Sequence, residues 1–347
     1  MGDTLITTTD AGFYCAAGDF YIDPWRPVAR AVVTHAHADH ARWGSAAYLV
    51  AEEGQRVFRT RLGPDAIIET LSYGAATQIN GVRVSLHPAG HILGSAQVRV
   101  EHRGEVWVES GDYKIEPDAT CTAFEPVRCD TFITEATFGL PIYRWRPQTE
   151  IFAEINAWWR ANQAAGAASI LYGYALGKAQ RLLSGLDPAI GPICVHGALP
   201  KLTDDYRASG IDLPPTMRVS EQVRGFDWSR AMILAPPSAH GTPWMRRFGT
   251  AVTAFASGWM RIRGTRRRRA IDRGFVLSDH ADWPGLLGAI AATGAGRVWV
   301  THGYTAVLAR YLAEHGLETH AVATRFDDDR GQSEEEQLVD ATAEPQE

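Results

Sequence analysis

Short apolar runs separated by turn-forming residues dominate the first 145 residues of the chain. Runs of about four to eight residues that are rich in β-branched and aromatic side chains, and bounded by Gly, Pro, Asn or Asp, are typical of β-strands. The apolar run Ala31-Val32-Val33 indicates a buried strand that ends at Thr34. Further strands are predicted around Leu5–Thr8, Gly12–Cys15, Phe20–Ile22, Gly274–Leu277, Arg297–Thr301 and His320–Thr324.

Two pairs of predicted strands are joined by tight turns. Asn80-Gly81 lies between short apolar segments, and Asn-Gly suits the type I′ turn of a two-residue hairpin because both positions take a positive φ. Arg103-Gly104 joins Gln97–Glu101 to Glu105–Val108 in a second predicted hairpin. We therefore expect the first part of the chain to be rich in strands and to contain few helices.

The pattern changes near Arg146. Within Gln148–Ala165, apolar residues recur at Ile151, Ile155 and Trp158, which is the spacing of one helix face. Strand-like and helix-like segments then alternate, which favours a parallel sheet separate from the strands before it. These segments are the strand Ser169–Tyr172, the helix Ala175–Leu186, and the strands Ile193–His196 and Ala231–Ala235.

A core interrupted by an insertion is the expected organisation, because 347 residues exceed the usual size of one simple core. Residues 1–145 and 266–325 are assigned to the core, and residues 146–265 to an inserted α/β domain. The second part of the core includes a predicted helix over Ala306–His315. Residues 326–347 carry few apolar and many charged side chains, a composition typical of disorder.

Composition argues against several classes of protein. The four cysteines are scattered without a Cys-x-x-Cys pair, so neither a disulfide framework nor a cysteine zinc site is expected. No apolar run is long enough to span a bilayer and no signal peptide is apparent, so we expect a cytoplasmic protein without a membrane partner. The net charge of −6 conceals an uneven distribution. Nine acidic residues and one arginine between Asp327 and Glu347 contribute −8, which leaves +2 on the rest of the chain.

Three histidines and an aspartate follow the strand that ends at Thr34. His35 and His37 are two residues apart, so they face the same side of an extended segment. Asp39 and His40 come after the chain has turned, which allows them to face a neighbouring point. The spacing therefore predicts a loop that holds two metal ions side by side, with a group of surface histidines as the plainer alternative.

Four further segments contain possible ligands. His91 has a glycine on either side, and glycine allows the backbone to approach a site closely. Asp112 follows a glycine at the end of a strand, where its two oxygens could bridge two ions, although a turn aspartate has the same pattern. His280 and His302 each follow an apolar strand. A single histidine at such a position is usually structural, but two of them favour a shared site.

These residues belong to an ordered set of motifs. The set consists of His35-x-His37-x-Asp39-His40, His91, Asp112, Thr134–Gly139, Tyr174–Gln180, Ala256–Trp259, His280 and His302. It resembles the β-CASP nucleases of the metallo-β-lactamase fold over nearly all of residues 10–325. The resemblance implies an α/β protein, namely a metallo-β-lactamase αβ/βα four-layer sandwich with an inserted β-CASP α/β domain, and an active site in a cleft between the two.

The resemblance also implies a role for each motif. One divalent ion, zinc or manganese, would be bound by His35, His37 and His91, a second by Asp39, His40 and His302, and Asp112 would bridge them. Glu135, in the first β-CASP motif, would orient His280. His280 would then protonate the leaving oxygen as a general acid. The expected catalytic residues are therefore Asp39, Asp112, Glu135 and His280.

Two segments are candidates for contact with substrate. Six of the nine residues from Arg261 to Arg269 are arginine, which is enough to follow a nucleic-acid backbone, although a solvated loop is the alternative. Lys178 and Gln180 lie at the start of a predicted helix, and they could contact a phosphate because a helix N-terminus can bind one. The candidate contacts are Lys178, Gln180, Arg261, Arg263, Arg266 and Arg267.

Within the family, the chain is most similar to bacterial DNA ligase-associated exonucleases, also called mRNA 3′-end processing factor-like. This implies a DNA exonuclease, with 5′ to 3′ polarity, that acts on single-stranded DNA in repair with an ATP-dependent DNA ligase and a helicase. His302 leaves an RNA-processing nuclease as an alternative, because histidine at the third β-CASP motif is typical of RNA processors. A small-ester hydrolase of the glyoxalase type would not need the insertion or the arginine run. A binding module without catalysis is disfavoured, because none of the seven expected metal ligands is missing.

Overall fold

The computed structural model describes residues 4–262 and 270–322 of the chain. These residues divide into two compact units: the first runs to Arg144 and resumes at His280, and the second is Trp145–Asp279. The insertion predicted over residues 146–265 lies within the second unit. That unit continues to Asp279 because the strand Arg273–Phe275 pairs with its sheet. The tail predicted over residues 326–347 lies outside the described residues.

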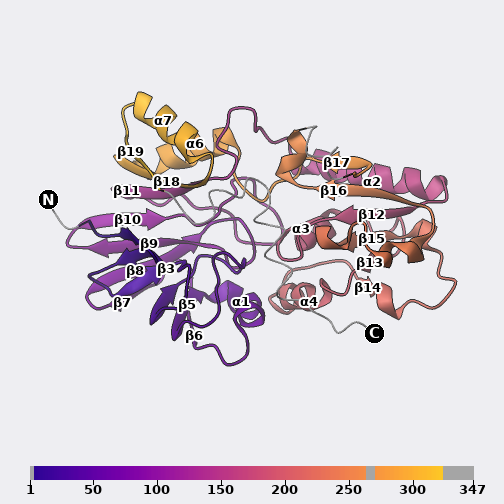
Figure 1. The fold of residues 1–347 in the computed structure, drawn as a ribbon, viewed down its shortest axis with the longest axis horizontal. Coiled ribbons are helices and arrows are strands. Elements are labelled where there is room, and N and C mark those ends of the chain that lie inside the picture. The colour runs from indigo at the N-terminus through magenta and orange to yellow at the C-terminus, as the bar shows by residue number, and fades with distance from the viewer. Residues whose placement is uncertain (1–3, 263–269, 323–347) are drawn as a thin grey trace. The chain divides into compact units, whose positions relative to one another are not determined.

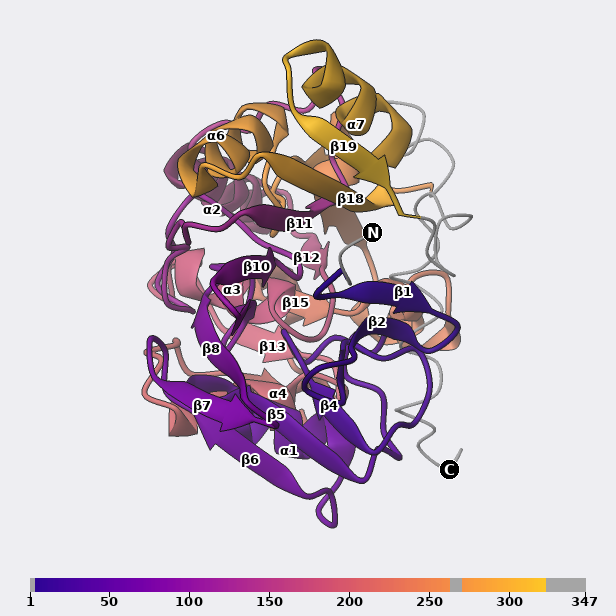
Figure 2. The same cartoon turned by 90° about the vertical axis from the view of Figure 1, so that its left-hand side faces the viewer.

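The first unit contains two sheets, whose strands are labelled in Figures 1 and 2. One sheet has the order β1-β2-β3-β4-β5-β6, antiparallel from β1 to β3 and parallel from β3 to β6. Its first three strands confirm the predicted ones to within two residues. The strands are β1 (Thr7–Thr9), β2 (Gly12–Cys15), β3 (Phe20–Ile22), β4 (Arg30–Val32), β5 (Ala47–Ala51) and β6 (Ile68–Leu71).

The second sheet of this unit has the order β19-β18-β11-β10-β9-β8-β7. Both predicted hairpins are confirmed in it, since β7 pairs with β8 and β9 with β10 in antiparallel fashion. Asn80 and Gly81 take φ of 48° and 83°, as a type I′ turn requires. The strands are β7 (Ala76–Ile79), β8 (Val82–Pro88), β9 (Ala96–His102), β10 (Glu105–Glu109), β11 (Thr131–Ala136), β18 (Arg297–Gly303) and β19 (Glu318–Ala321).

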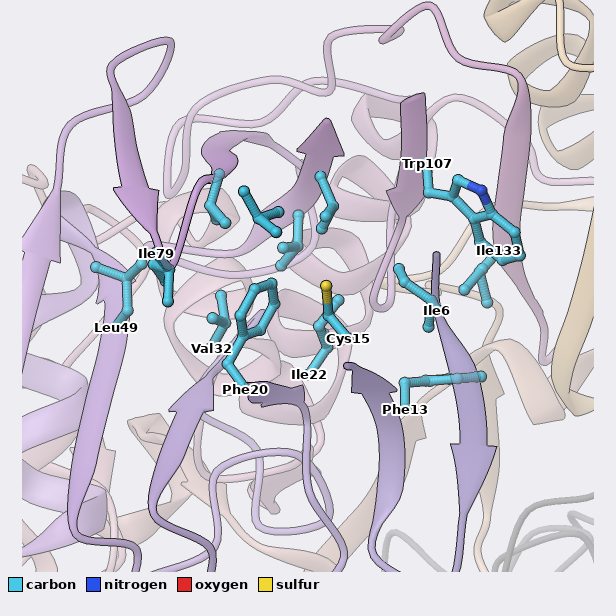
Figure 3. Packing of buried hydrophobic residues seen from close by; sticks show 14 of the residues in the cluster. Ile6, Phe13, Cys15, Phe20, Ile22, Val32, Leu49, Ile79, Trp107 and Ile133 are labelled. Carbon is cyan, nitrogen blue, oxygen red and sulfur yellow. The ribbon is translucent and has the colours of Figure 1, made fainter. Parts of the chain in front are cut away.

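A hydrophobic core fills the space between these two sheets. Figure 3 shows side chains of β2, β3 and β4, such as Cys15, Phe20 and Val32, on one side, with Trp107 and Ile133 of the other sheet opposite them. All five side chains are fully buried. Burial of each large apolar side chain stabilises the fold by about 1.5–3 kcal/mol.

The second sheet is buried on its other face as well, by helices α6 (Trp283–Thr293) and α7 (Thr305–Glu314) (Figure 2). Val298 and Val300 of β18 pack there against Leu286 of α6 and Leu308 of α7. All six residues of β11 are buried, as expected for a parallel strand that is covered on both faces. Helix α1 (Gln55–Leu62), which follows the short 3-10 helix η1 (Glu52–Gly54), contacts β5 and β6.

The second unit is built on one parallel sheet with the order β14-β13-β15-β12-β16-β17, which confirms the predicted parallel sheet. Among the described residues, none of its helices or those of the first unit is long and apolar enough to cross a membrane. The strands are β12 (Ala168–Tyr172), β13 (Ile193–Val195), β14 (Met217–Arg218), β15 (Met232–Ala235), β16 (Ala251–Ala256) and β17 (Arg273–Phe275). The helices are α2 (Gln148–Ala164), α3 (Lys178–Gly185), α4 (Pro200–Ala208), and the 3-10 helices η2 (Val219–Glu221), η3 (Trp228–Arg230), η4 (Pro237–Ala239), η5 (Pro243–Phe248) and η6 (Gly258–Arg261).

Two of the predicted boundaries that differ from the observed ones have a clear local reason. The strand predicted to reach Thr34 ends at Val32, because the Thr34 backbone N–H donates to the carboxylate of Asp23 at 2.8 Å and not to a strand. The helix predicted from Ala175 begins at Lys178. Gly177 has a φ of 84°, a left-handed conformation that cannot continue a right-handed helix.

Candidate metal centre

The loop that follows β4 is fixed by bonds from its first residue. The Thr34 hydroxyl and N–H both donate to Asp23, and the Thr34 carbonyl accepts from the Ala96 N–H at 2.8 Å. The chain then turns at His37, whose carbonyl accepts from the N–H of Ala41 at 2.8 Å. This turn places the ring of His40 beside that of His35, with ring centroids 4.0 Å apart.

The first three predicted imidazoles converge on Asp112. His37 Nδ1 lies 3.1 Å from the Nε2 atoms of both His35 and His91. The Oδ2 atom of Asp112 lies 3.6 Å from His35 Nε2 and 3.8 Å from His91 Nε2. One ligand atom from each of these four residues falls within 4.8 Å of the other three. Such a spacing allows all four to bind one ion.

The remaining predicted ligands are grouped around His40, which approaches the same oxygen of Asp112. His40 Nε2 lies 3.7 Å from Asp112 Oδ2 and 3.5 Å from Asp39 Oδ2. The half-buried ring of His302, at the end of β18, has its centroid 5.4 Å from that of His40. The structure thus brings all seven predicted metal ligands into one cluster, in which His35, His40 and His91 lie within 4.0 Å of Asp112 Oδ2.

His91 is placed by a loop that only glycine permits. Gly90 has a φ of 72°, and a Cβ atom at this position would lie 2.5 Å from the Lys114 carbonyl oxygen. The hydroxyl of Ser95 accepts the His91 N–H at 3.0 Å and closes the loop. A close backbone approach of this kind was expected from the glycines that flank His91.

Asp23 contacts a predicted metal ligand, although sequence reasoning did not include it in the site. Its Oδ2 atom lies 2.6 Å from His40 Nδ1, and its other oxygen accepts from Thr34. A carboxylate on the second ring nitrogen fixes the tautomer and orientation of a metal-binding histidine. In the sequence, Asp23 is marked only by the proline that follows it, which is typical of a turn. In the structure, Asp23 adopts a φ of 43°.

The electrostatics of the cluster differ from ligand to ligand. Burial lowers the pKa of His40, but the carboxylates of Asp39, Asp112 and Asp23 outweigh burial and raise it well above its usual value. Burial, followed by the neighbouring imidazoles, holds the pKa of His35 well below its usual value, so this ring is neutral at pH 7. Burial is also the largest influence on Asp112 and raises the pKa of its carboxyl to about 7. A divalent cation beside Asp112 would favour its ionised form.

The chemistry of this donor set fits divalent metal ions. Buried histidine nitrogens and carboxylate oxygens, within reach of a common point, are the ligands of zinc and also of manganese. No cysteine lies among them. The residues present can therefore hold metal. Among the described residues, three groups place their ligand atoms within 4.8 Å of one another: His35, His37, His91 and Asp112; Asp23, His35 and His40; and Asp112, Glu135 and His280.

Glu135 and His280 form a pair next to this cluster. His280 Nδ1 lies 3.0 Å from Glu135 Oε2, and the Glu135 carboxylate also accepts the Tyr113 N–H at 2.8 Å. Burial raises the pKa of Glu135, but the adjoining His280 and these hydrogen bonds outweigh burial and leave it below its usual value. Glu135 is thus an anion suited to hold an imidazole in one orientation. His280 Nδ1 also lies 4.0 Å from Asp112 Oδ2.

The residues predicted to contact substrate are not all exposed in the structure. Lys178 and Gln180 are buried in the second unit, where Lys178 pairs with Asp279 and Gln180 bonds to the Gly177 N–H and the Ala175 carbonyl. Their side chains are thus engaged within the protein, and the expected contact with phosphate needs correction. Arg261 is exposed at the end of η6. The other predicted contacts, Arg263, Arg266 and Arg267, lie outside the described residues.

Trp43 is a second residue that sequence reasoning missed. It follows His40 by three residues, so their Cα atoms are at most about 11 Å apart, and 79% of its surface is exposed. The loop around it is fixed, because the Tyr48 hydroxyl donates to the Arg42 carbonyl and accepts from the Ser45 N–H. A large aromatic side chain is thus presented to solvent from a rigid loop near the cluster.

Comparison with curated proteins finds relatives over most of the chain. A protein named probable DNA ligase from Opitutus terrae is 32% identical over 315 residues, which are 90% of this chain and 30% of that protein. Endoribonuclease YSH1 of Candida albicans is 34% identical over 35% of this chain and 14% of its own length. Cleavage and polyadenylation specificity factor 73 of Drosophila melanogaster is 28% identical over 50% of this chain and 26% of its own length. The chain thus spans less than a third of the length of each of these relatives.

A search of family models finds no match to the chain. Among solved structures, a protein of unknown function from Enterococcus faecalis V583 matches with a TM-score of 0.56 over 85% of this chain and 79% of its own. The two sequences are 11% identical, so this match shows a shared fold and nothing more.

Proposed function

We propose that this protein is a metal-dependent nuclease of the β-CASP type, on a metallo-β-lactamase fold, that hydrolyses phosphodiester bonds. One observation carries the proposal. The Oδ2 atom of Asp112 lies within 4.0 Å of ring nitrogens of four histidines, three of them predicted ligands and the fourth the predicted acid His280. A carboxylate in that position can bind two ions and lie next to a proton donor at the same time.

The proposed ligands follow from the two groups around Asp112. His35, His37 and His91 would hold one ion, Asp39, His40 and His302 the other, and Asp112 both. When bound, two zinc or manganese ions supply Lewis acidity towards the phosphate oxygens and water. The protein fixes this arrangement through buried contacts such as that from Asp23 to His40.

His280 is proposed as the general acid. Its Nδ1 atom is bonded to the anionic Glu135, so a proton on Nε2 is the one that the ring can give to the leaving oxygen. In the hydrolysis, the oxygen of water forms a bond to phosphorus and loses a proton to solvent, the bond from phosphorus to the sugar oxygen breaks, and the sugar oxygen takes the proton of His280. Glu135 keeps the ring oriented and stabilises its charged form.

DNA is the proposed substrate because of the relative that matches most of the chain. The segment similar to this protein forms 30% of a protein named probable DNA ligase, which supports a link between this chain and strand joining. We propose exonuclease action, 5′ to 3′, on single-stranded DNA, in repair together with an ATP-dependent DNA ligase and a helicase. Trp43, exposed beside the cluster, supports this choice, because an aromatic side chain can stack on an unpaired base.

RNA processing is the second candidate. His302 lies beside His40, where the third β-CASP motif has histidine in RNA-processing members. Two of the relatives, Endoribonuclease YSH1 and cleavage and polyadenylation specificity factor 73, also have names from RNA cleavage, although they match half of this chain or less.

The two candidates are separated by one assay. The purified protein is incubated with single-stranded DNA and RNA of matched sequence, each labelled at the 5′ or the 3′ end, in manganese and in zinc. Early release of labelled mononucleotide from 5′-labelled DNA, absent in Asp112→Ala, would support the proposal and its polarity. Preferential cleavage of RNA would move the protein to the second candidate, and no cleavage of either polymer would overturn the nuclease assignment.

A further inference from the structure

Three buried charged residues of the second unit meet at the segment that precedes His280. Lys178 and Arg181 lie in the first turn of α3, and Asp279 is the last residue of the unit. Asp279 Oδ1 lies 2.8 Å from Lys178 Nζ and 2.9 Å from a terminal guanidinium nitrogen of Arg181. Their exposed fractions are 7% for Asp279 and 2% for each of the two cations. We call these three residues the α3 clamp.

The clamp also holds the backbone on either side of Ser278. Lys178 Nζ donates to the carbonyl of Leu277 at 2.7 Å, and Arg181 donates to the carbonyl of Ser278. The guanidinium of Arg181 is fixed from another direction by the side-chain oxygen of Gln148, at 3.0 and 3.1 Å. Each of the residues 277–279 thus accepts a charged hydrogen bond from α3.

A contribution to stability does not explain such a cluster. Charged groups lose their hydration on burial, and well-packed apolar side chains are often at least as stabilising as the ion pairs they replace. What the buried ions do provide is one fixed geometry. The segment needs such fixing, because β17 ends at Phe275 and the residues after it have no ladder of strand hydrogen bonds.

The fixed segment leads directly to His280. A peptide bond joins Asp279 to His280, and on the other side the N–H of Ala281 donates to the carbonyl of Tyr113 at 2.7 Å. The His280 backbone is therefore held within one residue in both directions. A side chain that transfers a proton must be placed to within about 0.5 Å, and it is placed by what holds its own backbone and ring.

We infer that the α3 clamp positions His280 for proton transfer. This inference rests on the proposed function, in which His280 is the general acid. It gives Lys178 and Arg181 a role that requires burial, in place of the contact with phosphate that was expected for Lys178. Neither residue touches the reacting atoms in this account, so both are positioning residues.

The test compares two substrates that differ in their need for an acid. The leaving group of an oligodeoxynucleotide is a sugar hydroxyl, which must be protonated, whereas bis(p-nitrophenyl) phosphate releases a nitrophenolate, which need not be. Lys178→Met removes one cation of the clamp at similar length. Arg181→Lys keeps the charge but loses the planar fork. Arg160→Met is the matched control, because it removes an exposed ion pair with Asp187 in the same unit.

The expected pattern is a selective loss. In Lys178→Met, kcat for the oligodeoxynucleotide falls by about 10- to 100-fold with KM unchanged, while the rate for the nitrophenyl ester changes little. Arg181→Lys gives a smaller loss of the same kind, and Arg160→Met gives none. In a His280→Ala background, Lys178→Met lowers the rate no further, because both changes act through one residue. Thermal unfolding shows which variants are folded.

Two results would overturn the inference. One is an equal fall on both substrates in a folded clamp variant, and the other is a full further loss when Lys178→Met is added to His280→Ala. Selectivity between the substrates in His280→Ala but not in the folded clamp variants would overturn the clamp and leave the proposed function intact. A wild-type protein that cleaves no polynucleotide would overturn the proposed function, and the clamp's role with it.

Discussion

The Nδ1 atom of His40 lies 2.6 Å from the Oδ2 atom of Asp23, a buried carboxylate 17 residues earlier in the chain. The same carboxylate accepts from the N–H and the hydroxyl of Thr34, the residue that opens the metal loop. One side chain thus sets both the start of the loop and the orientation of one of its rings. This relationship links the fold of β3 and β4 to the chemistry of the site.

Asp23→Asn is predicted to weaken metal binding. The amide retains the shape of the carboxylate but removes the negative charge beside His40, and loss of such an outer partner typically lowers metal affinity by about 10- to 100-fold. Competition with a chromophoric chelator measures the affinity. Asp19→Asn is the control, because Asp19 is an exposed carboxylate that bonds only to the Tyr14 hydroxyl among the contacts described. Equal affinities in Asp23→Asn and wild type would contradict the role of Asp23.

Glu135→Gln is predicted to lower kcat while leaving the metal content unchanged. Glutamine can still accept one bond from Tyr113, but it does not stabilise a charged imidazole as the carboxylate does. General acid–base groups contribute about 10²- to 10⁴-fold, and we expect a loss within that range that does not exceed the loss in His280→Ala. Single-turnover cleavage of labelled DNA measures it. A variant as active as wild type would show that the orientation of His280 does not depend on Glu135.

Trp43→Ala is predicted to weaken binding of single-stranded DNA with no change in metal content. Stacking of a base on an aromatic ring contributes about 1–3 kcal/mol, equivalent to about 5- to 150-fold in Kd. Fluorescence anisotropy in a His280→Ala background measures binding without cleavage. Trp43→Phe should retain most of the affinity. Ile67→Ala, which removes another exposed apolar side chain (62% exposed) of the same unit, should retain all of it. Equal loss in all three variants would rule out stacking.

Trp107→Ala is predicted to destabilise the protein by about 3–5 kcal/mol. Trp107 is fully buried, lies edge-on to Trp299 at 5.0 Å between centroids, and donates its indole N–H to Glu105. The same substitution at the exposed Trp43 should change stability by less than about 0.5 kcal/mol. Urea unfolding of the two variants gives the comparison. Similar losses at both positions would contradict the packing of the core between the two sheets.

Much of the fold was predictable because local chemistry determines it. The Asn80-Gly81 hairpin depends on two positive φ values that these residue types favour, and the stripe at Ile151, Ile155 and Trp158 marks one buried helix face. The segment with β5, α1 and β6 was not predicted. Its strands pair in parallel with the strand before or after them in the chain, and a parallel pair needs a long crossover, so no tight-turn signal joins them.

The candidate site likewise has residues that the sequence identified and residues that it did not. The metal loop could be identified because its ligands are adjacent in sequence and of distinctive types. Asp23 could not, because its partner His40 is distant in sequence and a turn aspartate before proline is common. Lys178 was expected to meet a substrate, since the start of a helix offers an anion site, but the sequence does not show that Asp279 occupies that position.

The most direct test of the central claim is the rate of phosphodiester hydrolysis as manganese or zinc is added to metal-free protein. Single-stranded DNA is the substrate, and the rate is plotted against metal equivalents per chain. We expect the rate to rise until two equivalents are bound, and Asp112→Ala to stay inactive throughout, because one carboxylate would serve both ions. Full activity in metal-free protein, or none at two bound equivalents, would contradict a dinuclear metal nuclease.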